Sequence, residues 1–266
     1  MEWEDDVELT EGSALTMIKM LESFRYDNPK NKNYNLLLSR SYANYAMGFL
    51  EWNMLKYQGV DEAKRQQNED RAIRFYTKGK DYGLNVLMRH GGFKAAAGKD
   101  MDTFKKSLRG FGRGAVPELF WTAMNWGSLI NLKKDSPIAI AEFPKVEAIM
   151  QRVMELDEFY FYGSPHLFMG FSYGSRPAMF GGDAKKSQEH FEKGIEAYKR
   201  KFLLGLVFYA QGYCVQALDH ELFRTLLNEV LTTDAAVLPE QRLANELAKL
   251  RAKWMLANEA KVFGGT

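Results

Sequence analysis

Apolar residues recur at intervals of three and four along almost the whole chain, which is the spacing of one buried face of an α-helix. No segment shows the strict alternation of apolar and polar residues that marks a β-strand. Glycine and proline interrupt the pattern at several points, where helices end. The pattern therefore predicts an all-α protein, with helices at about residues 10–26, 34–58, 61–89, 101–109, 116–132, 144–156, 164–176, 183–199, 202–217, 219–232 and 239–262.

Two local features refine these elements. Asp61, Asp183 and Asp219 stand at predicted helix starts, where a short acceptor side chain can bind free backbone N–H groups. The glycine-rich stretch 110–114, with the region 91–110 before it, is the loosest part of the pattern and predicts a mobile loop. No Lys-Ser or Lys-Thr follows these glycines, which excludes a phosphate-binding loop.

Several helix pairs share a spacing of one small, one aromatic and a second small residue. Ser187, Phe191 and Gly194 follow it, as do Ala72, Tyr76 and Gly79, whereas the matches at 146–153 and 219–226 are weaker. The spacing lets two helices pack closely around a ring and is typical of tetratricopeptide repeats. It predicts one all-α domain over 1–266, an α-α superhelix of degenerate tetratricopeptide-like hairpins at 34–89, 116–156, 164–199 and 202–232, with a capping helix at 239–262.

Composition argues against several functional classes. The 36 basic and 34 acidic residues leave a net charge of +2, and no run of five basic residues occurs, so nucleic-acid binding is not expected. The single cysteine, Cys214, cannot form an internal disulfide or a cysteine-based zinc site. The four histidines include no close ligand pair. We therefore expect no metal site and no cofactor.

Three segments, 115–132, 159–174 and 202–218, are almost free of charge. The last approaches the length of a bilayer span, but it contains Gln211 and Gln216 and follows a Lys-Arg-Lys run. We expect a helix that is buried on all sides, or one that lines a cavity or a subunit contact. The acidic first residues lack the apolar core of a signal peptide, so the signal of an exported protein would have been removed from this sequence.

Aromatic clusters supply the candidate binding residues. Their rings either wedge between packed helices or line an apolar cavity with a few polar groups, as in small-molecule sites. The candidate histidine is either a hydrogen-bonded core residue or part of that cavity. The candidate arginine either caps the carbonyl groups at the end of its helix or binds a carboxylate. These candidates are Tyr42, Tyr45, Trp121, Asn125, Trp126, His166, Tyr173 and Arg176.

No arrangement of nucleophile, base and orienting group stands out, so we interpret the chain as non-enzymatic, with no catalytic residue. Several short segments resemble, in this order, the T component associated with tripartite ATP-independent periplasmic (TRAP) transporters, from about Leu36 to near the end of the chain. They are Ser41-Tyr-Ala-Asn-Tyr-Ala46, Phe75-Tyr76 with Asp81-Tyr82-Gly83, Leu119-Phe-Trp-Thr-Ala123 with Asn125-Trp126, Pro165-His-Leu-Phe-Met-Gly170, Arg176-Pro-Ala178 with Gly181-Gly-Asp183, Asp219 with Phe223, and Arg242-Leu-Ala-Asn245 with Arg251-Ala-Lys-Trp254.

The resemblance implies a periplasmic, usually lipid-anchored protein that works with the transporter's solute-binding protein. It also implies a homo-oligomer, with a trimer expected, and cavities for an apolar organic acid. The sequence departs from the family at its start, where neither a signal peptide nor a lipid-bearing cysteine stands. The anchor is thus inferred from the family alone, and the family supplies no catalytic residues.

The leading hypothesis is a non-catalytic accessory of solute uptake. It would self-associate through the uncharged helices, dock a periplasmic binding protein and relay a hydrophobic carboxylate. The alternative is a tetratricopeptide-like scaffold whose polar, charged groove grips an extended peptide. A third hypothesis is a hydrolase, which would need a nucleophile and a base within hydrogen-bond reach of each other.

Overall fold

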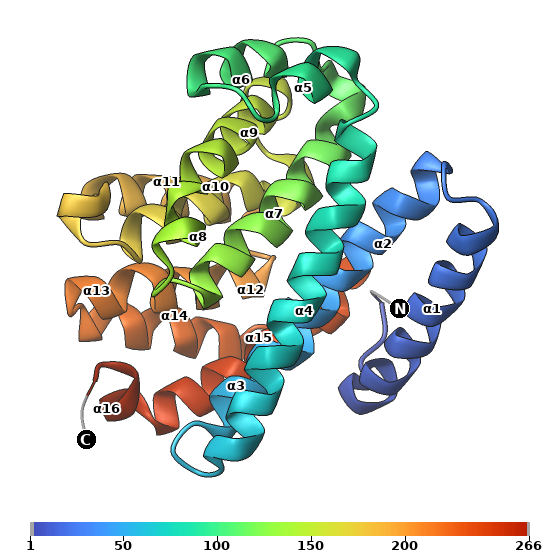
Figure 1. Ribbon diagram of the computed structural model, residues 1–266. Helices are drawn as coiled ribbons and strands as arrows, with labels where there is room; N and C mark the ends of the chain where they lie inside the picture. Colours follow the sequence, from blue (N-terminus) through green and yellow to red (C-terminus); the bar gives the residue numbers. More distant parts are fainter. Residues whose placement is uncertain (1–2, 265–266) are drawn as a thin grey trace. The chain divides into compact units, whose positions relative to one another are not determined.

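The computed structural model describes residues 3–264, which are helical with no β-strand among them. The prediction of an all-α fold is therefore confirmed. Figure 1 shows the helices in chain order from α1 to α16. The α-helices are α1 Val7–Asp27, α2 Lys32–Tyr45, α3 Glu51–Tyr57, α4 Glu62–Leu87, α5 Gly91–Ala96, α6 Met101–Leu108, α7 Val116–Leu132, α8 Pro137–Ala141, α9 Phe143–Leu156, α10 Tyr160–Gly174, α11 Ala184–Glu196, α12 Leu203–Tyr209, α13 Val215–Ala217, α14 His220–Thr232, α15 Arg242–Ala257 and α16 Glu259–Val262.

The three predicted caps are confirmed. The side chain of Asp61 accepts a hydrogen bond from the backbone N–H of Lys64 at the start of α4, at 3.0 Å. Asp183 and Asp219 accept the corresponding bonds at the starts of α11 and α14. Each carboxylate satisfies a backbone donor that the first helical turn leaves unpaired, and its negative charge lies at the positive end of the helix dipole.

Residues 91–110 are more ordered than the loose loop expected there, and α6 confirms the helix predicted at 101–109. Helices α5 and α6 occupy most of this region, and Phe93, Phe104 and Phe111 are almost fully buried. The ring centroid of Phe93 lies 5.4 Å from that of Phe104 and 5.6 Å from that of Phe111. The Phe93 ring contacts both other rings, and the burial of the three rings orders a segment that its glycines alone would leave loose, because it removes a large apolar area from water.

Two of the predicted long helices contain a π-helical turn. Ala46–Leu50 separates α2 from α3, and Ala210–Cys214 separates α12 from α13. Both turns follow a buried tyrosine, Tyr45 or Tyr209, and share the sequence Tyr-Ala-x-Gly followed by an aromatic residue. A π-turn adds one residue to a helical turn and re-aims the side chains after it, which helical periodicity does not reveal.

The chain divides into two compact units, residues 11–157 and residues 158–264 together with 3–10. In the first unit α2 and α3 pack against α4, α4 against α7, and α7 against α9. In the second α10 packs against α11, and α12 against α14 and α15. The helices within the four expected hairpins are therefore in contact. Their stacking as tetratricopeptide-like repeats and the single domain stay predictions.

The uncharged helices form the interior of each unit. Most of α7 is buried, including Phe120 and Trp121, and α12 is buried along nearly all of its length. Self-association through the uncharged helices stays a prediction, for which α7 and α12 offer little apolar surface. The reason is that neighbouring helices of the same unit already cover them. Of the described helices, none combines the length and the apolar character that a membrane crossing needs.

Candidate functional site

A tight turn at the start of α10 fixes how this helix crosses α11. Phe161, Tyr162 and Gly163 have left-handed backbone angles, with φ values of 45°, 61° and 76°. A Cβ atom on Gly163 would lie 2.4 Å from the carbonyl oxygen of Gly194 in α11. Only glycine permits this approach, and it brings the following turns of α10 against α11.

A pair of histidines joins the two helices. The Nδ1 atoms of His166 on α10 and His190 on α11 are 2.9 Å apart, and His166 Nε2 lies 3.0 Å from Glu158 Oε1. Because the carboxylate only accepts, His166 carries its proton on Nε2 and accepts at Nδ1 from the Nδ1–H of His190. The sequence did not indicate this contact, because 24 positions separate two residues that the helix crossing brings together.

Burial controls the charge of this pair. His166 is 1% exposed, and burial lowers its pKa against the opposing effect of Glu158. Burial, followed by the charge of His166, lowers the pKa of His190 to about 4. Both rings are therefore neutral near pH 7. The ring of Phe159 stacks on His166 at 5.5 Å, and the ring of Tyr173 stacks on His190 at 5.6 Å.

Tyr173 connects the histidine pair to two cations. The guanidinium carbon of Arg176 lies 5.8 Å from the centroid of the Tyr173 ring, and Lys186 Nζ lies 5.5 Å from it. Arg176 Nε also donates to the carbonyl oxygen of Ser172 at 2.8 Å, which is the capping role expected as one of its two interpretations. Lys186 Nζ is 3.5 Å from the carboxylate of Asp183. Tyr173, Arg176, Lys186 and Asp183 thus form one cluster of polar and charged groups.

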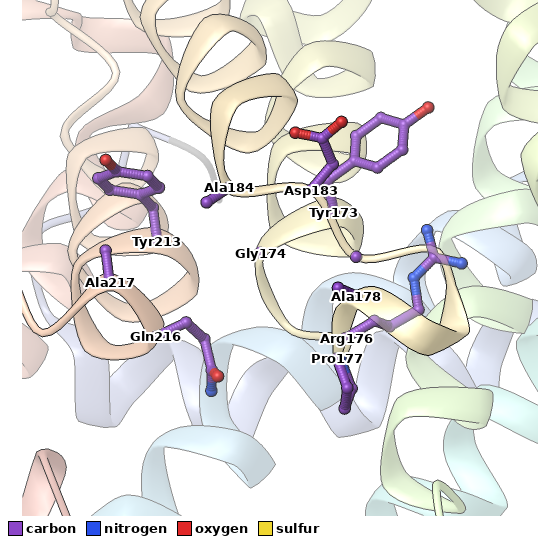
Figure 2. A pocket seen from close by; sticks show the side chains of 11 residues that line it. Tyr173, Gly174, Arg176, Pro177, Ala178, Asp183, Ala184, Tyr213, Gln216 and Ala217 are labelled. Carbon is purple, nitrogen blue, oxygen red and sulfur yellow. The ribbon is translucent and has the colours of Figure 1, made fainter.

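A cavity of about 260 Å³ opens beside this cluster. Figure 2 shows Tyr173 and Arg176 on one side of it, and Tyr213, Gln216 and Ala217 on the other. Its size lies below the roughly 300–1,000 Å³ of sites for drug-sized ligands, so it suits a small molecule. It is lined by Tyr173, Gly174, Arg176, Pro177, Ala178, Gly182, Asp183, Ala184, Tyr213, Gln216 and Ala217.

The π-turn before α13 shapes the far wall of the cavity. Tyr213 lies inside the turn, and Gln216 follows it. A Cβ atom on Gly174 would lie 2.1 Å from the carbonyl oxygen of Gly212, so the end of α10 touches the backbone of the turn. The lining combines the guanidinium of Arg176, the carboxylate of Asp183, two phenol hydroxyls and an amide, and the guanidinium can bind one anionic group of an organic molecule. In the part of the chain that the structure describes, no cluster of three or more His, Cys, Asp or Glu could hold a metal ion.

The candidates in residues 11–157 lie in packed surroundings. The hydroxyl of Tyr42 donates to Glu22 Oε1 at 2.6 Å, and Lys78 Nζ and the hydroxyl of Tyr82 reach the same oxygen. Burial raises the pKa of Glu22, but hydrogen bonds from Lys19, Tyr42 and Lys78 outweigh it and lower this pKa to about 2. Burial, with the hydrogen bond to Glu22 next, raises the pKa of Tyr42 strongly.

The remaining candidates of this unit are also buried. The ring of Tyr45 contacts that of Phe75, and burial is the main cause that raises the pKa of Tyr45. Asn125 donates through Nδ2 to the backbone oxygens of Ser39 and Trp121, at 2.9 and 2.7 Å. The indole N–H of Trp126 donates to Glu142 at 2.9 Å, and Trp121 is 2% exposed.

The structure thus divides the eight candidates between its units. His166, Tyr173 and Arg176 come together in residues 158–264, whereas the other five belong to residues 11–157. Sequence reasoning missed Glu158, His190, Tyr213 and Gln216 as neighbours of the first group. The sequence does single out Gln216, because it is a polar residue in an uncharged segment. Nothing in the sequence singles out the other three, because only the crossing of α10 and α11 and the π-turn bring them near.

Comparison with known proteins identifies the family of this chain. A model of the TRAP transporter T-component family matches residues 3–263, almost the entire chain. The chain belongs to this family. T components are periplasmic-side accessories of TRAP transport systems and do not form a known enzyme family. The chain is also similar to an uncharacterized protein of Treponema pallidum (strain Nichols), with 25% identity over 266 residues that cover 98% of this chain and 81% of that protein.

Proposed function

We propose that this T component is a non-catalytic periplasmic protein that docks the solute-binding protein of its TRAP system and shelters a small hydrophobic organic acid. The observation that carries the proposal is the family match over residues 3–263, since it places nearly all of the chain in a transport accessory family. A lipid anchor attached before the present first residue would hold it at the membrane.

The cavity beside Tyr173 supports the ligand part of the proposal. Arg176 supplies a permanently charged guanidinium, and the hydroxyl of Tyr213 and the amide of Gln216 supply further polar groups. The rings and the backbone around them would contact an apolar tail. The guanidinium of Arg176 favours an anionic head group over a cationic one.

Self-association, with a trimer expected, would use exposed apolar residues in place of the uncharged helices. On α1, Met17, Met20 and Phe24 follow one another at intervals of three and four residues and are 36%, 54% and 49% exposed. Residues at this spacing share one face of a helix. An exposed apolar stripe of this kind supports a protein contact on α1.

The test combines the protein with the solute-binding protein of its TRAP system. We expect a stoichiometric complex in analytical ultracentrifugation, and binding of hexanoate by isothermal titration calorimetry. Arg176→Gln should weaken hexanoate binding about tenfold, because a charged hydrogen-bonding partner is lost. Lys185→Gln is the matched control, since it also removes one positive charge. Lys185 is highly exposed and lies next to Ala184, which lines the cavity. A monomeric protein that binds neither partner would refute the proposal.

A further inference from the structure

We propose that α5 and α6, with the turns that flank them, form a basic surface that rests on the anionic head groups of a phospholipid bilayer. This basic surface, residues 89–113, belongs to the unit of residues 11–157. The inference goes beyond the proposed function, because neither the cavity nor the solute-binding protein takes part in it. It adds a second contact with the membrane to the lipid anchor.

Charge is distributed unevenly along the chain. Residues 89–113 contain seven basic and two acidic residues, a net charge of +5, whereas the whole chain carries +2. The remaining 29 basic and 32 acidic residues carry −3, so a net charge close to zero conceals a surface of one sign. All seven basic residues of the surface are exposed. They are Arg89, Lys94, Lys99, Lys105, Lys106, Arg109 and Arg113.

Few carboxylates neutralise the basic surface. Among residues 3–264, Arg113 is the only one of the seven in an ion pair, at 3.9 Å from Asp157 outside the segment. Asp100, one of the two acidic residues, is engaged at the start of α6, where it accepts from the backbone N–H and the hydroxyl of Thr103 at 3.0 and 2.7 Å. Most of the positive charges are therefore available to an anion outside the protein.

Packing beneath the basic surface fixes its position. Phe93, Phe104 and Phe111 are buried under it. From α9, Arg152 donates to the carbonyl oxygens of Arg109 and Phe111, at 3.4 and 2.7 Å. Figure 1 shows α5 and α6 at one end of the unit, beside α9 and the end of α4. A surface that is ordered before binding loses little conformational entropy when an anionic layer covers it.

The composition of the basic surface fits lipid head groups better than a protein or a nucleic acid. Four of its seven basic residues are lysines, which protein interfaces contain rarely, and such interfaces rely on exposed aromatic anchors. Of the large apolar side chains that are exposed, none lies in residues 89–113. Its three phenylalanine rings are buried and cannot stack on nucleic-acid bases. An anionic bilayer needs only accessible positive charge, and clusters of about four to eight Lys or Arg bind it.

The experiment measures sedimentation of the 266-residue chain with phospholipid vesicles. Vesicles of phosphatidylcholine with about 30% phosphatidylglycerol present an anionic surface, and pure phosphatidylcholine is the neutral reference. We expect binding to the anionic vesicles alone. Raising the salt concentration from about 0.1 M to about 0.5 M should weaken this binding at least about tenfold, because salt screens exposed charges.

Two pairs of adjacent lysines locate the contact. Lys105→Gln/Lys106→Gln should weaken vesicle binding about 25-fold, since each lysine near an anionic bilayer contributes about fivefold. Lys133→Gln/Lys134→Gln is the matched control, because both lysines are exposed and follow the end of α7. The start of α7 adjoins the basic surface and the helix has 17 residues, so the control pair lies about 25 Å away. Its binding should stay within about twofold of that of the unmodified protein, since the distance exceeds the Debye length.

Each outcome supports or overturns the membrane contact. A loss in the Lys105→Gln/Lys106→Gln protein alone supports it. Equal losses in both double variants, or equal binding to neutral vesicles, would overturn it. So would a Lys105→Gln/Lys106→Gln protein that keeps its vesicle binding but no longer binds the solute-binding protein, since residues 89–113 would then be a protein contact.

A second variant covers the case in which the first does not fold. Lys94→Gln/Lys99→Gln removes two other exposed charges of the basic surface and should cause a similar loss of vesicle binding. Circular dichroism checks the fold of each variant. Vesicle binding does not depend on hexanoate binding or on the complex with the solute-binding protein, so failure of this inference and failure of the proposed function are distinguishable.

Discussion

Replacing Glu22 by Gln tests how much one buried carboxylate contributes to residues 11–157. Glu22 lies on α1 and accepts hydrogen bonds from Tyr42 on α2 and from Lys78 and Tyr82 on α4. The substitution keeps the shape of the side chain and removes its charge. It therefore weakens the contacts that hold α1 to the two helices and leaves the apolar packing in place.

The magnitude follows from the lowered pKa of Glu22. Its shift from 4.5 to about 2 corresponds to at most ~3.4 kcal/mol, since one pKa unit is worth 1.36 kcal/mol. The side chain is 16% exposed, and its partners Lys19 and Lys78 are 74% and 53% exposed, so solvent screens part of this interaction. We expect Glu22→Gln to lower the free energy of unfolding by about 1.5–2 kcal/mol at pH 7.

The sign of the pH dependence follows from the same shift. Because the pKa is lower in the folded than in the unfolded state, the stabilisation is complete above pH 4.5. It disappears as the pH falls through 2. The difference between the unmodified protein and Glu22→Gln should therefore be large at pH 7 and close to zero at pH 2.

The assay is urea unfolding followed by circular dichroism and tryptophan fluorescence. Glu69→Gln is the matched control, because Glu69 is 22% exposed and pairs with Arg65 on its own helix. Such a pair contributes about 0.2–0.5 kcal/mol. A Glu22→Gln protein within 0.5 kcal/mol of the unmodified protein at pH 7, or a difference that is unchanged at pH 2, would refute the reasoning.

Three further predictions concern residues 158–264. Because the pKa of His190 in the folded state is about 4, the free energy of unfolding should be highest above pH 6.5 and should fall toward pH 4, by about 1–2 kcal/mol at pH 5. Urea unfolding of His190→Gln should show a smaller decline between pH 7 and 5. Phe191→Ala should cost about 3–5 kcal/mol of unfolding free energy, since the ring is fully buried and stacks on Tyr209 at 4.9 Å, and a loss under 1 kcal/mol would contradict this packing. Gly174→Ala should lower the melting temperature and weaken hexanoate binding, because its Cβ meets the carbonyl oxygen of Gly212, whereas Gly92→Ala, with open space around it, should do neither.

Local sequence determined the helices and their ends. The three-to-four spacing of apolar residues located α7 at the predicted residues 116–132, and Asp61, Asp183 and Asp219 marked three starts correctly. These features depend on residues within one or two turns of each other. The family resemblance was also readable from short ordered segments, and the match over residues 3–263 confirms it.

Tertiary structure decided what the helices bring together. His166 and His190 are 24 positions apart, and only the close crossing that Gly163 permits sets their Nδ1 atoms at 2.9 Å. For the uncharged segment 202–218 the sequence left open a buried helix, a cavity lining or a subunit contact; the structure buries α12 against α14 and α15. The π-turn at Ala210–Cys214, which places Tyr213 at the cavity, leaves no mark in the apolar spacing. Periodicity encodes which face of a helix is apolar, whereas the partner of that face is fixed by packing between residues far apart in the chain.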